Sequence, residues 1–339
     1  MAEAVKWGVM GNANIARVCV IPAIQKSCNG NVHALATRSP ARAQEVAADH
    51  QIGQVYGSYD ALLADPAIDV IYIALPNHLH CPWTVKALKA GKHVLCEKPL
   101  ACSAKEAMEM VSAAENSGRY LMEAFMYRFH PRSRRIKQLL EEGRIGAPCL
   151  VRSAFCFRMR EKDWTSEKNT RLKPEMGGGA LLDVGCYSVS VARWFLGAEP
   201  TQVQAQAVYH PGGVDVHMVG TLGFADTALA TFEASFISAL QQTYSIAGAE
   251  GVIELPHNAF IPWENDAAFS LRGQDQDEGQ QHVIPGADEY QLMVDHFAEA
   301  AMGRVALAFS PEDSIHNMRV LDALAKAAKT GKQIELQAK

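Results

Sequence analysis

The sequence predicts an α/β protein in which a doubly wound parallel-sheet domain precedes an α+β domain built on a large, mostly antiparallel open sheet. Up to about residue 128, short apolar runs alternate with helical patterns, as in a parallel sheet with helices on both faces. Beyond it, several runs alternate apolar and polar residues, which is typical of antiparallel strands with one covered face. A chain of 339 residues also has the length of about two domains. We therefore expect domains at 1–128 and 129–339.

The elements of the first domain follow from apolar runs and helix-boundary residues. The run at 70–74 (VIYIA) is apolar throughout, as in a strand buried on both faces. Pro40 suits a first helical turn, Gly118 suits a C-cap, and Pro22 should bend the helix that contains it. We expect strands at 5–10, 32–37, 70–74, 93–96 and 120–124, and helices at 13–26, 40–49, 59–65, 82–91 and 103–117.

The second domain shows a different pattern. Its strand-like segments alternate in period two, and its helical segments are fewer. We expect strands at 150–157, 202–209, 228–236 and 242–248, and helices at 131–142, 179–196 and 311–329. Helices on one face of such a sheet leave the other face open.

Composition and charge exclude several classes of protein. Hydrophobic residues make up 48% of the chain and charged residues 20%, as in a globular protein. The net charge is −5, which does not favour nucleic-acid binding, and no run reaches the roughly 20 apolar residues of a membrane span. The eight cysteines form no C-x-x-C pair, so we expect reduced thiols in a cytoplasmic protein without a metal site.

The first strand leads into a glycine turn. Residues 11–16 read G-x-A-x-x-A, a degenerate form of the dinucleotide-binding fingerprint in a strand–turn–helix context. Small residues there let the backbone approach a pyrophosphate, which the helix N-terminus attracts. An ordinary turn between a strand and a helix is the alternative. The candidate cofactor contacts of this turn are Gly8, Gly11, Ala13, Asn14 and Ile15.

The end of the second strand favours NADP over NAD. An NAD-binding domain usually has an Asp or Glu about 20 residues after the glycine turn, to bind the ribose hydroxyls. This chain has Thr37, Arg38 and Ser39 there, with Arg42 one helical turn later. A guanidinium and hydroxyl groups suit a 2′-phosphate. Arg38 could instead be an exposed turn residue.

Two further segments lie at the carboxyl edge of the predicted sheet, where doubly wound folds bind ligands. LPNHLH (75–80) follows one strand, and CEKPL (96–100) follows the next. Lys98 could point into a cleft and donate protons, with Glu97 as a charge partner. In isolation an E-K-P string is more often a surface turn.

These strand-end motifs, GNANIA, ATRS, LPNHLH and EKPL, followed by an α+β half, resemble the Gfo/Idh/MocA oxidoreductase family over essentially the whole chain. The resemblance implies that Lys98 is catalytic and that a later aspartate segment supplies its partners. Asp183 matches the family aspartate. Tyr187 stands where other family members often have histidine, and a tyrosine at this position resembles the branch of dihydrodiol and aldose dehydrogenases. The resemblance adds these cofactor contacts: Leu75, Pro76, Asn77, His80, Glu97, Lys98 and Arg128.

Asp183 and Tyr187 are four residues apart on a predicted helix and therefore share a face. The glycines at 177–179 could bring backbone close to a ligand. A tyrosine near a lysine is a workable acid/base pair because the ammonium favours the phenolate. Either residue could instead serve packing. Trp164 could line the substrate mouth together with Lys98, Asp183 and Tyr187, or it could belong to a solvated loop.

The function expected from these motifs is hydride transfer between NADP and a hydroxyl-bearing carbon of a sugar or cyclic diol. A non-catalytic nucleotide sensor should lack Lys98. An NAD-dependent inositol-type dehydrogenase should carry histidine in place of Tyr187, and a hydrolase with tightly held NAD fits poorly with Arg38.

The open sheet face also predicts self-association. The strands at 228–236 and 242–248 place Phe, Tyr and Ile among small residues, so part of that face should be apolar. The resemblance to the family also implies association through this sheet. We expect a homodimer or homotetramer through this sheet, with Phe232 and Phe236 at the interface.

Overall fold

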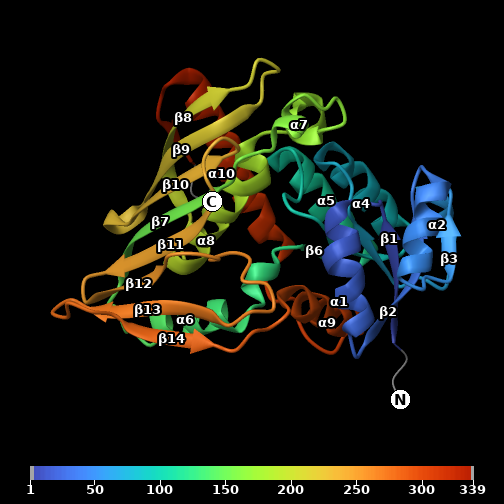
Figure 1. Cartoon of the computed structure of the whole chain (residues 1–339), viewed down its shortest axis with the longest axis horizontal. Coiled ribbons are helices and arrows are strands. Elements are labelled where there is room, and N and C mark those ends of the chain that lie inside the picture. The colour runs from blue at the N-terminus through green and yellow to red at the C-terminus, as the bar shows by residue number, and fades with distance from the viewer. Residues whose placement is uncertain (1–3, 337–339) are drawn as a thin grey trace. The chain divides into compact units, whose positions relative to one another are not determined.

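The computed structural model describes residues 4–336 (Figure 1). Its contacts divide the chain into two compact units. The first ends at Phe129 but also takes in Asp288–Ile315; the second comprises His130–Ala287 and the chain from His316. The expected division at 128/129 therefore misplaces one segment, because residues 288–315 return to the first unit.

The first unit contains a six-stranded parallel sheet in the order β3-β2-β1-β4-β5-β6. The order reverses between β1 and β4, which is the point where doubly wound sheets bind ligands. The strand β3 was not expected, because a run of only three residues carries little strand signal. The strands are β1 (Val5–Met10), β2 (Gly30–Ala36), β3 (Gln54–Tyr56), β4 (Val70–Ile73), β5 (His93–Cys96) and β6 (Leu121–Glu123).

The helices of the first unit match the expected segments closely. Ser103 caps α5 by accepting the Glu106 N–H, and Gly118 ends it with a φ of 62°. These two residues confirm the boundaries predicted for that helix. The helices are α1 (Ile21–Lys26), α2 (Pro40–Asp49), α3 (Tyr59–Ala64), α4 (His80–Lys89) and α5 (Ala104–Ser117), with short turns at Asn77–Leu79 and Met126–Arg128.

The predicted bend at Pro22 takes the form of a π turn. Residues Ala16–Val20 are π-helical, and the Ile21 N–H donates to the Ala16 carbonyl. Pro22 has no N–H to donate, so the preceding turn widens without losing a regular α-helical bond. The helix continues as α1.

The helix α9 (Glu289–Ala301) was not expected. It belongs to the first unit and packs against α1 and β2. Its buried face carries Phe297, whose ring lies 5.9 Å from that of Trp7 in β1. The Asp288 side chain caps α9 by accepting two backbone N–H groups. The spacing of its apolar residues was readable as a helix signal.

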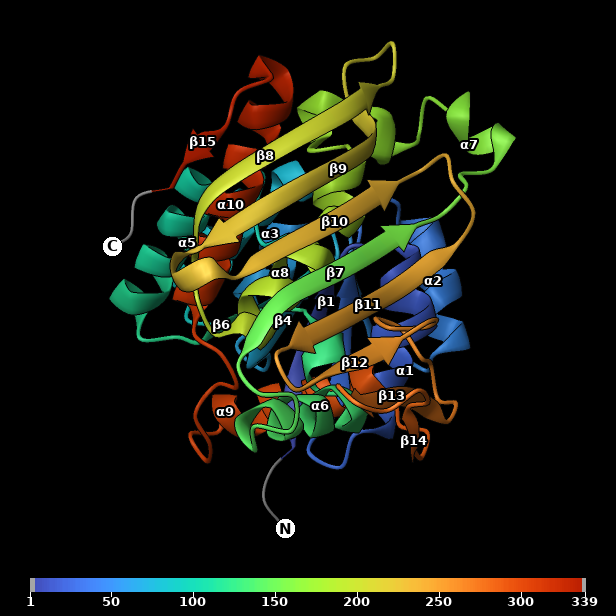
Figure 2. The same ribbon diagram turned by 90° about the vertical axis from the view of Figure 1, so that its left-hand side faces the viewer.

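The second unit is built on a nine-stranded sheet in the order β14-β13-β12-β11-β7-β10-β9-β8-β15 (Figure 2). Within this sheet, β7 and β10 are the only described strands that pair in parallel, so the mostly antiparallel sheet is confirmed. The strands are β7 (Pro148–Cys156), β8 (Pro200–Tyr209), β9 (Asp215–Phe224), β10 (Leu229–Ser235), β11 (Gln241–Gly248), β12 (Gly251–Leu255), β13 (Ala267–Gly273), β14 (Gln280–Ile284) and β15 (Ile334–Glu335).

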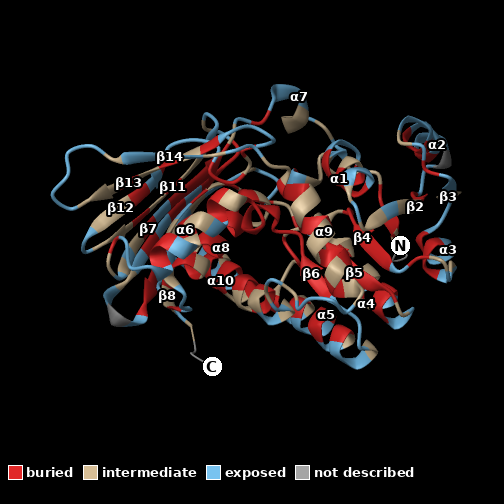
Figure 3. Ribbon diagram, turned by 90° about the horizontal axis from the view of Figure 1, so that it is seen from below, coloured by how far each residue is buried: buried red, intermediate tan, exposed pale blue. Residues whose placement is uncertain are grey.

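One face of this sheet is covered by helices. A π turn at Leu181–Gly185 runs into α8 (Cys186–Leu196), which packs on β7 and β10. The Ser153 hydroxyl on β7 donates to the Ser188 hydroxyl of α8 at 2.9 Å. Figure 3 shows the buried residues of α8 and the strands behind it. The other helices are α6 (Pro131–Glu141), α7 (Glu161–Trp164) and α10 (Pro311–Thr330).

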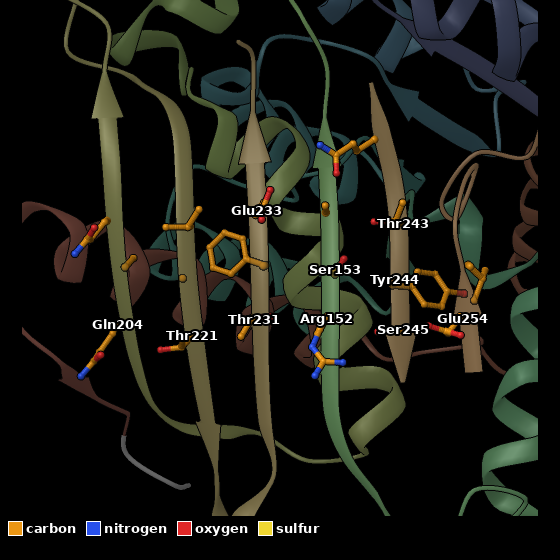
Figure 4. Close-up of a pocket in the computed structure, with 18 of the residues that line it drawn as sticks. Arg152, Ser153, Gln204, Thr221, Thr231, Glu233, Thr243, Tyr244, Ser245 and Glu254 are labelled. Atoms are coloured by element: carbon orange, nitrogen blue, oxygen red, sulfur yellow. The ribbon is translucent and has the colours of Figure 1, made fainter. Parts of the chain in front are cut away.

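The open face does not carry the two aromatic residues that were expected there. Phe232 is 3% exposed and lies beside Ser153, so it faces α8 rather than solvent. Phe236 is fully buried against Phe157. The expected place of Phe232 and Phe236 at an interface on this face is therefore wrong, because both side chains point inward, whereas Val219 and Leu229 are exposed on β9 and β10. The exposed side chains of the central strands include the charged residues Arg152 and Glu233, which Figure 4 labels. Among the described residues, no helix is long and apolar enough to cross a membrane.

Candidate active site

The turn after β1 brings backbone close to the sheet edge. Gly11 has a φ of 104°, and a Cβ there would overlap the Ala74 carbonyl oxygen. Only glycine fits both the conformation and the space. Gly8 lies within β1, where a Cβ would meet Ile68 and Ile71 side chains at 3.0 Å. Gly8 therefore serves sheet packing, and Gly11 serves the turn.

Helical structure begins at Asn14, directly after this turn. Ala13 and Ile15 are half-buried, while Asn14 is exposed and accepts a hydrogen bond from Arg17 at 3.5 Å. Backbone N–H groups at a helix start have no partner within the helix and attract anions. The turn can therefore accept a pyrophosphate.

The end of β2 is cationic and exposed. Thr37 is buried at the strand end, and its hydroxyl accepts the Ser39 N–H at 3.2 Å. Arg38 and Arg42 are exposed beside it. Burial raises the pKa of the Tyr59 phenol, an effect that the nearby Arg38 guanidinium opposes. This strand end fits the 2′-phosphate of NADP better than a ribose diol.

The lysine loop follows β5 and is firmly anchored. The Tyr72 hydroxyl donates to the Glu97 carboxylate at 2.7 Å, and burial raises the pKa of Tyr72. The Leu100 N–H donates to the buried Glu123 at 2.8 Å. Lys98 between these anchors is half-buried, so its side chain has access to a ligand. Tyr72 and Glu123 were not predicted, although a tyrosine in a fully buried strand implies a polar partner.

His80 links two segments of this edge. Its ring nitrogens lie 2.8 Å from the Leu75 carbonyl and 2.9 Å from the Pro99 carbonyl. Burial lowers the pKa of the His80 imidazole. His80 therefore ties residues 75–80 to the lysine loop instead of facing a ligand, whereas Pro76 and Asn77 are half-buried at the edge.

Arg128 has a structural explanation. Its guanidinium is buried, pairs with Asp313 at 2.9 Å and lies 4.5 Å from the ring centre of Phe309. These contacts hold residues 309–313 within the first unit. The expectation that Arg128 contacts the cofactor arose from resemblance, and the structure instead shows a buried ion pair.

Asp183 lies in the π turn before α8 and has a cationic partner. Arg171 Nε donates to Asp183 Oδ2 at 2.6 Å, and this aspartate raises the pKa of Arg171. The Asp183 side chain is 17% exposed. Sequence analysis missed Arg171, because nothing in the local pattern links two residues twelve positions apart in a loop.

Tyr187 lies in the first turn of α8 and is 4% exposed. Its ring centre is 5.3 Å from that of Phe155 and 5.5 Å from that of Phe260. These aromatic contacts fix the direction of the phenol. Together with Asp183, it lies at the start of the helix that covers β7.

The glycines before this helix serve backbone packing. Asp215 on β9 accepts the Leu181 N–H at 2.7 Å and so caps the helix from another strand. A Cβ on Gly179 would overlap the Asp215 carboxylate, and a Cβ on Gly178 would lie 2.5 Å from the Arg171 carbonyl oxygen. Burial raises the pKa of Asp215. Gly178 and Gly179 thus admit neighbouring protein groups.

Trp164 braces its own loop. The indole N–H donates to the Met159 carbonyl at 3.2 Å, and the ring stacks on His210 at 5.7 Å. It is half-buried. These contacts account for the tryptophan without a substrate.

The predicted residues fall into two groups. The cofactor residues other than Arg128 gather around one edge of the first unit, and Lys98 lies among them; Asp183 and Tyr187 belong to the second unit. No group of three or more His, Cys, Asp or Glu residues in the described part of the chain could hold a metal ion.

Comparison with known families decides the relationship. Residues 5–125 match the model described as "Oxidoreductase family, NAD-binding Rossmann fold", and residues 133–254 match the GFO/IDH/MocA C-terminal domain. The chain belongs to the Gfo/Idh/MocA oxidoreductase family. The resemblance inferred from the strand-end motifs is thereby confirmed.

Relatives within the Gfo/Idh/MocA family act on sugars and diols. The chain is 38% identical to a D-xylose 1-dehydrogenase (NADP(+)) of Haloferax volcanii, over 97% of this chain and 99% of the relative. It is 37% identical to trans-1,2-dihydrobenzene-1,2-diol dehydrogenase of Danio rerio, over 76% of each chain. A 3-ketoreductase from Actinomadura kijaniata, solved with NADP and TDP-benzene, superposes with a TM-score of 0.89 at 29% identity, covering 96% of this chain and 98% of that one.

Proposed function

We propose that this chain is an NADP-dependent oxidoreductase that transfers hydride between the nicotinamide and a hydroxyl-bearing carbon of a sugar or cyclic diol. Membership of the Gfo/Idh/MocA family and the activities of the relatives support the reaction class. The observation that carries the proposal is the carboxyl edge of the first sheet. There a Gly11 turn, a cationic strand end and an anchored Lys98 lie on one sheet edge.

The residues of this edge fit NADP. The Gly11 turn leaves room for a pyrophosphate that a Cβ would fill, and Arg38 and Arg42 stand exposed for a 2′-phosphate. When bound, the cofactor supplies hydride acceptance and donation. The protein has to bind it, hold the substrate and move one proton.

We assign the proton transfer to Tyr187 and Lys98. Tyr187 takes the proton of the substrate hydroxyl during oxidation and returns it during reduction. The Lys98 ammonium favours the phenolate form of Tyr187 and polarises the reacting oxygen. Asp183 binds a second substrate hydroxyl while Arg171 holds its carboxylate in place. An inositol-type dehydrogenase is less well supported, since tyrosine replaces the expected histidine.

The test is NADP⁺ reduction, followed by the absorbance of the reduced nicotinamide, across a panel of aldoses, inositols and dihydrodiols. The same panel is run with NAD⁺. Turnover of an aldose or diol with NADP⁺ would support the proposal. Binding of NADP without turnover of any alcohol or carbonyl compound would favour a nucleotide sensor.

We also infer that two copies associate through the open face of the second sheet, as a homodimer or a pair of dimers. This face contains a hollow of about 930 Å³ (Figure 4). Arg152 and Glu233 are exposed there on the central strands β7 and β10. A two-fold axis through the hollow would set each against its opposite charge on the second copy.

The state of the cysteines supports a proposal about the cellular compartment of the protein. All eight are free in the structure, and burial raises the pKa of the Cys19 and Cys81 thiols to about 11 and about 12. Buried neutral thiols are inert core residues and favour the reducing cytoplasm.

A further inference from the structure

A cavity in the second unit lies outside the residues assigned above, except that it shares Arg171 with them. It has a volume of about 500 Å³ and lies within the segment between β7 and the π turn. This is large enough for a phosphate or carboxylate with part of a sugar attached. Its lining residues are Phe157, Arg158, Met159, Arg160, Asp163, Ser166, Lys168, Asn169 and Arg171.

The lining has an excess of positive charge. It contains four cationic side chains and one carboxylate. Asp163 pairs with Arg160 at 2.8 Å, and Arg171 pairs with Asp183 at 2.6 Å. Arg158 and Lys168 have no acidic partner among the described residues, and both are exposed. The cavity therefore has two cationic groups whose charge the protein does not balance.

The loop that carries these cations is fixed by its own contacts. The Asn169 amide donates to the Asp163 carbonyl at 2.9 Å, and its carbonyl oxygen accepts the Arg171 N–H at 3.2 Å. The contacts of Trp164 with Met159 and His210 hold the other side of the loop. The cavity wall thus exists before any ligand binds, which lowers the entropic cost of binding.

The cavity adjoins the proposed substrate site through one side chain. Arg171 lines the cavity and also holds Asp183, so a substrate bound at Asp183 lies one side chain away from the cations. We propose that this cavity binds an anionic substituent of the substrate, a phosphate ester or a carboxylate, through Arg158 and Lys168. The proposal rests on the proposed function, since it specifies the class of sugar that the site accepts.

The main test compares neutral and anionic substrates. The ratio of kcat/KM for a sugar phosphate or a uronate to that for the parent aldose is measured in the wild type and in the double variant Arg158→Gln/Lys168→Gln. We expect the wild type to prefer one of the anionic forms, and the double variant to lose that preference by about tenfold or more while its neutral-sugar rate is unchanged. Which anionic form is preferred separates a phosphate from a carboxylate ligand.

Lys162→Gln provides a matched control. Lys162 is exposed on the same loop but does not line the cavity, so its loss changes the net charge by the same step as either single substitution. This variant should keep the wild-type ratio. A loss of anion preference in Lys162→Gln equal to that in Arg158→Gln or Lys168→Gln alone would indicate long-range attraction rather than a binding site and would overturn the proposal.

A second measurement does not depend on redox activity. Binding of a sugar phosphate and of a uronate to the wild type and to the double variant is followed by calorimetry without nucleotide. Binding that disappears in the double variant, in a protein that oxidises no alcohol, would support the anion site and reject the proposed reaction. Turnover of neutral sugars with no anion preference and no anion binding would reject the anion site alone.

Discussion

At the scale of single residues, the pairing of Lys98 and Tyr187 is the most direct proposal to test. Each single substitution, Lys98→Met or Tyr187→Phe, should lower kcat by roughly 10²–10⁴-fold. Tyr187→Phe removes the hydroxyl that transfers the proton, and Lys98→Met removes the ammonium that favours its phenolate form. The double substitution should cost little more than the worse single one, since the two residues act as a unit. Steady-state kinetics with saturating NADP⁺ measures all three. A Tyr187→Phe enzyme with near-normal turnover would reduce Tyr187 to its packing role against Phe155 and Phe260.

Arg38 should determine cofactor choice. Arg38→Ala should weaken NADP⁺ binding by roughly 10- to 150-fold, the value of a lost hydrogen bond to a charged group, and should leave NAD⁺ binding almost unchanged. Fluorescence titration of both nucleotides tests this. Lys89→Ala, at an exposed position at the end of α4, is the control and should alter neither affinity. Equal losses for the two nucleotides would mean that Arg38 contacts something other than the 2′-phosphate.

Glu123 should make stability depend on pH. Burial raises the pKa of its carboxyl from 4.5 to about 7, and Asp313 adds to this while Arg128 opposes it. Between about pH 4.5 and pH 7 the folded state therefore holds a proton that the unfolded state releases, so this group's stabilising effect is lost as pH rises. Glu123→Gln cannot ionise and still offers an acceptor to Leu100. Relative to the wild type, its free energy of unfolding should increase across that range by up to about 3 kcal/mol.

Urea denaturation at the two ends of that pH range measures the difference. Glu115→Gln, an exposed position on α5, serves as the control and should follow the wild-type profile. A Glu123→Gln protein whose stability stays parallel to the wild type at both ends would show that folding does not shift the pKa of Glu123.

The site residues that were predicted belong to local sequence motifs, whereas those that were not predicted contact residues far away in the sequence. Gly11, Arg38 and Lys98 stand at strand ends within local motifs, and their positions follow from the order of strands. Arg171 and Asp215 act on residues 12 and 34 positions away. Such contacts depend on how loops and strands meet in space, and no pattern within a short window reveals them. Arg128 shows the reverse case, since the motif was visible but its partner Asp313 was not.

At the scale of elements, the start of the helix that carries Asp183 and Tyr187 depends on a cap from another strand. Asp215→Ala should lower the free energy of unfolding by about 1–2 kcal/mol, because the Leu181 N–H loses its partner. Gly179→Ala should also destabilise, since its Cβ would overlap Asp215 and its φ is 116°. The double variant should be less destabilised than the sum of the two, because the overlap disappears with the carboxylate. Additive losses would show that only backbone strain matters at Gly179.

Most helices and nine of the fifteen described strands were predictable because their apolar periods and caps are local, whereas β3, β9 and β12 to β15 were not expected. The exceptions have physical reasons. A strand of three residues such as β3 is stabilised by its neighbour β2 rather than by its own sequence. The two π turns preserve helical patterns while changing the hydrogen-bond ladder, so sequence periodicity does not distinguish them from α-helix. In α9 the buried apolar residues recur at helical spacing, so this helix too is readable from the sequence.

At the scale of the whole molecule, assembly can now be tested at positions that the structure selects. A charge at Phe232 or Phe236 should unfold the sheet, since both side chains are buried. Glu233→Lys changes an exposed residue of the open face and should dissociate the proposed dimer by placing it near Arg152 of the second copy. Glu141→Lys, an exposed charge reversal on α6, should leave the assembly intact. Light scattering gives the masses, and a wild type with the mass of one chain would exclude the sheet interface.

The return of residues 288–315 to the first unit also constrains how the protein can be made. On the ribosome the first 129 residues emerge together, yet the helix that covers Trp7 follows only after the whole nine-stranded sheet except its last edge strand has been synthesised. The nucleotide-binding half is therefore incomplete through most of translation. During that interval the apolar surface around Trp7 lacks the cover of α9, and Arg128 lacks its partner Asp313, so this half depends on a segment that is synthesised after most of the second unit.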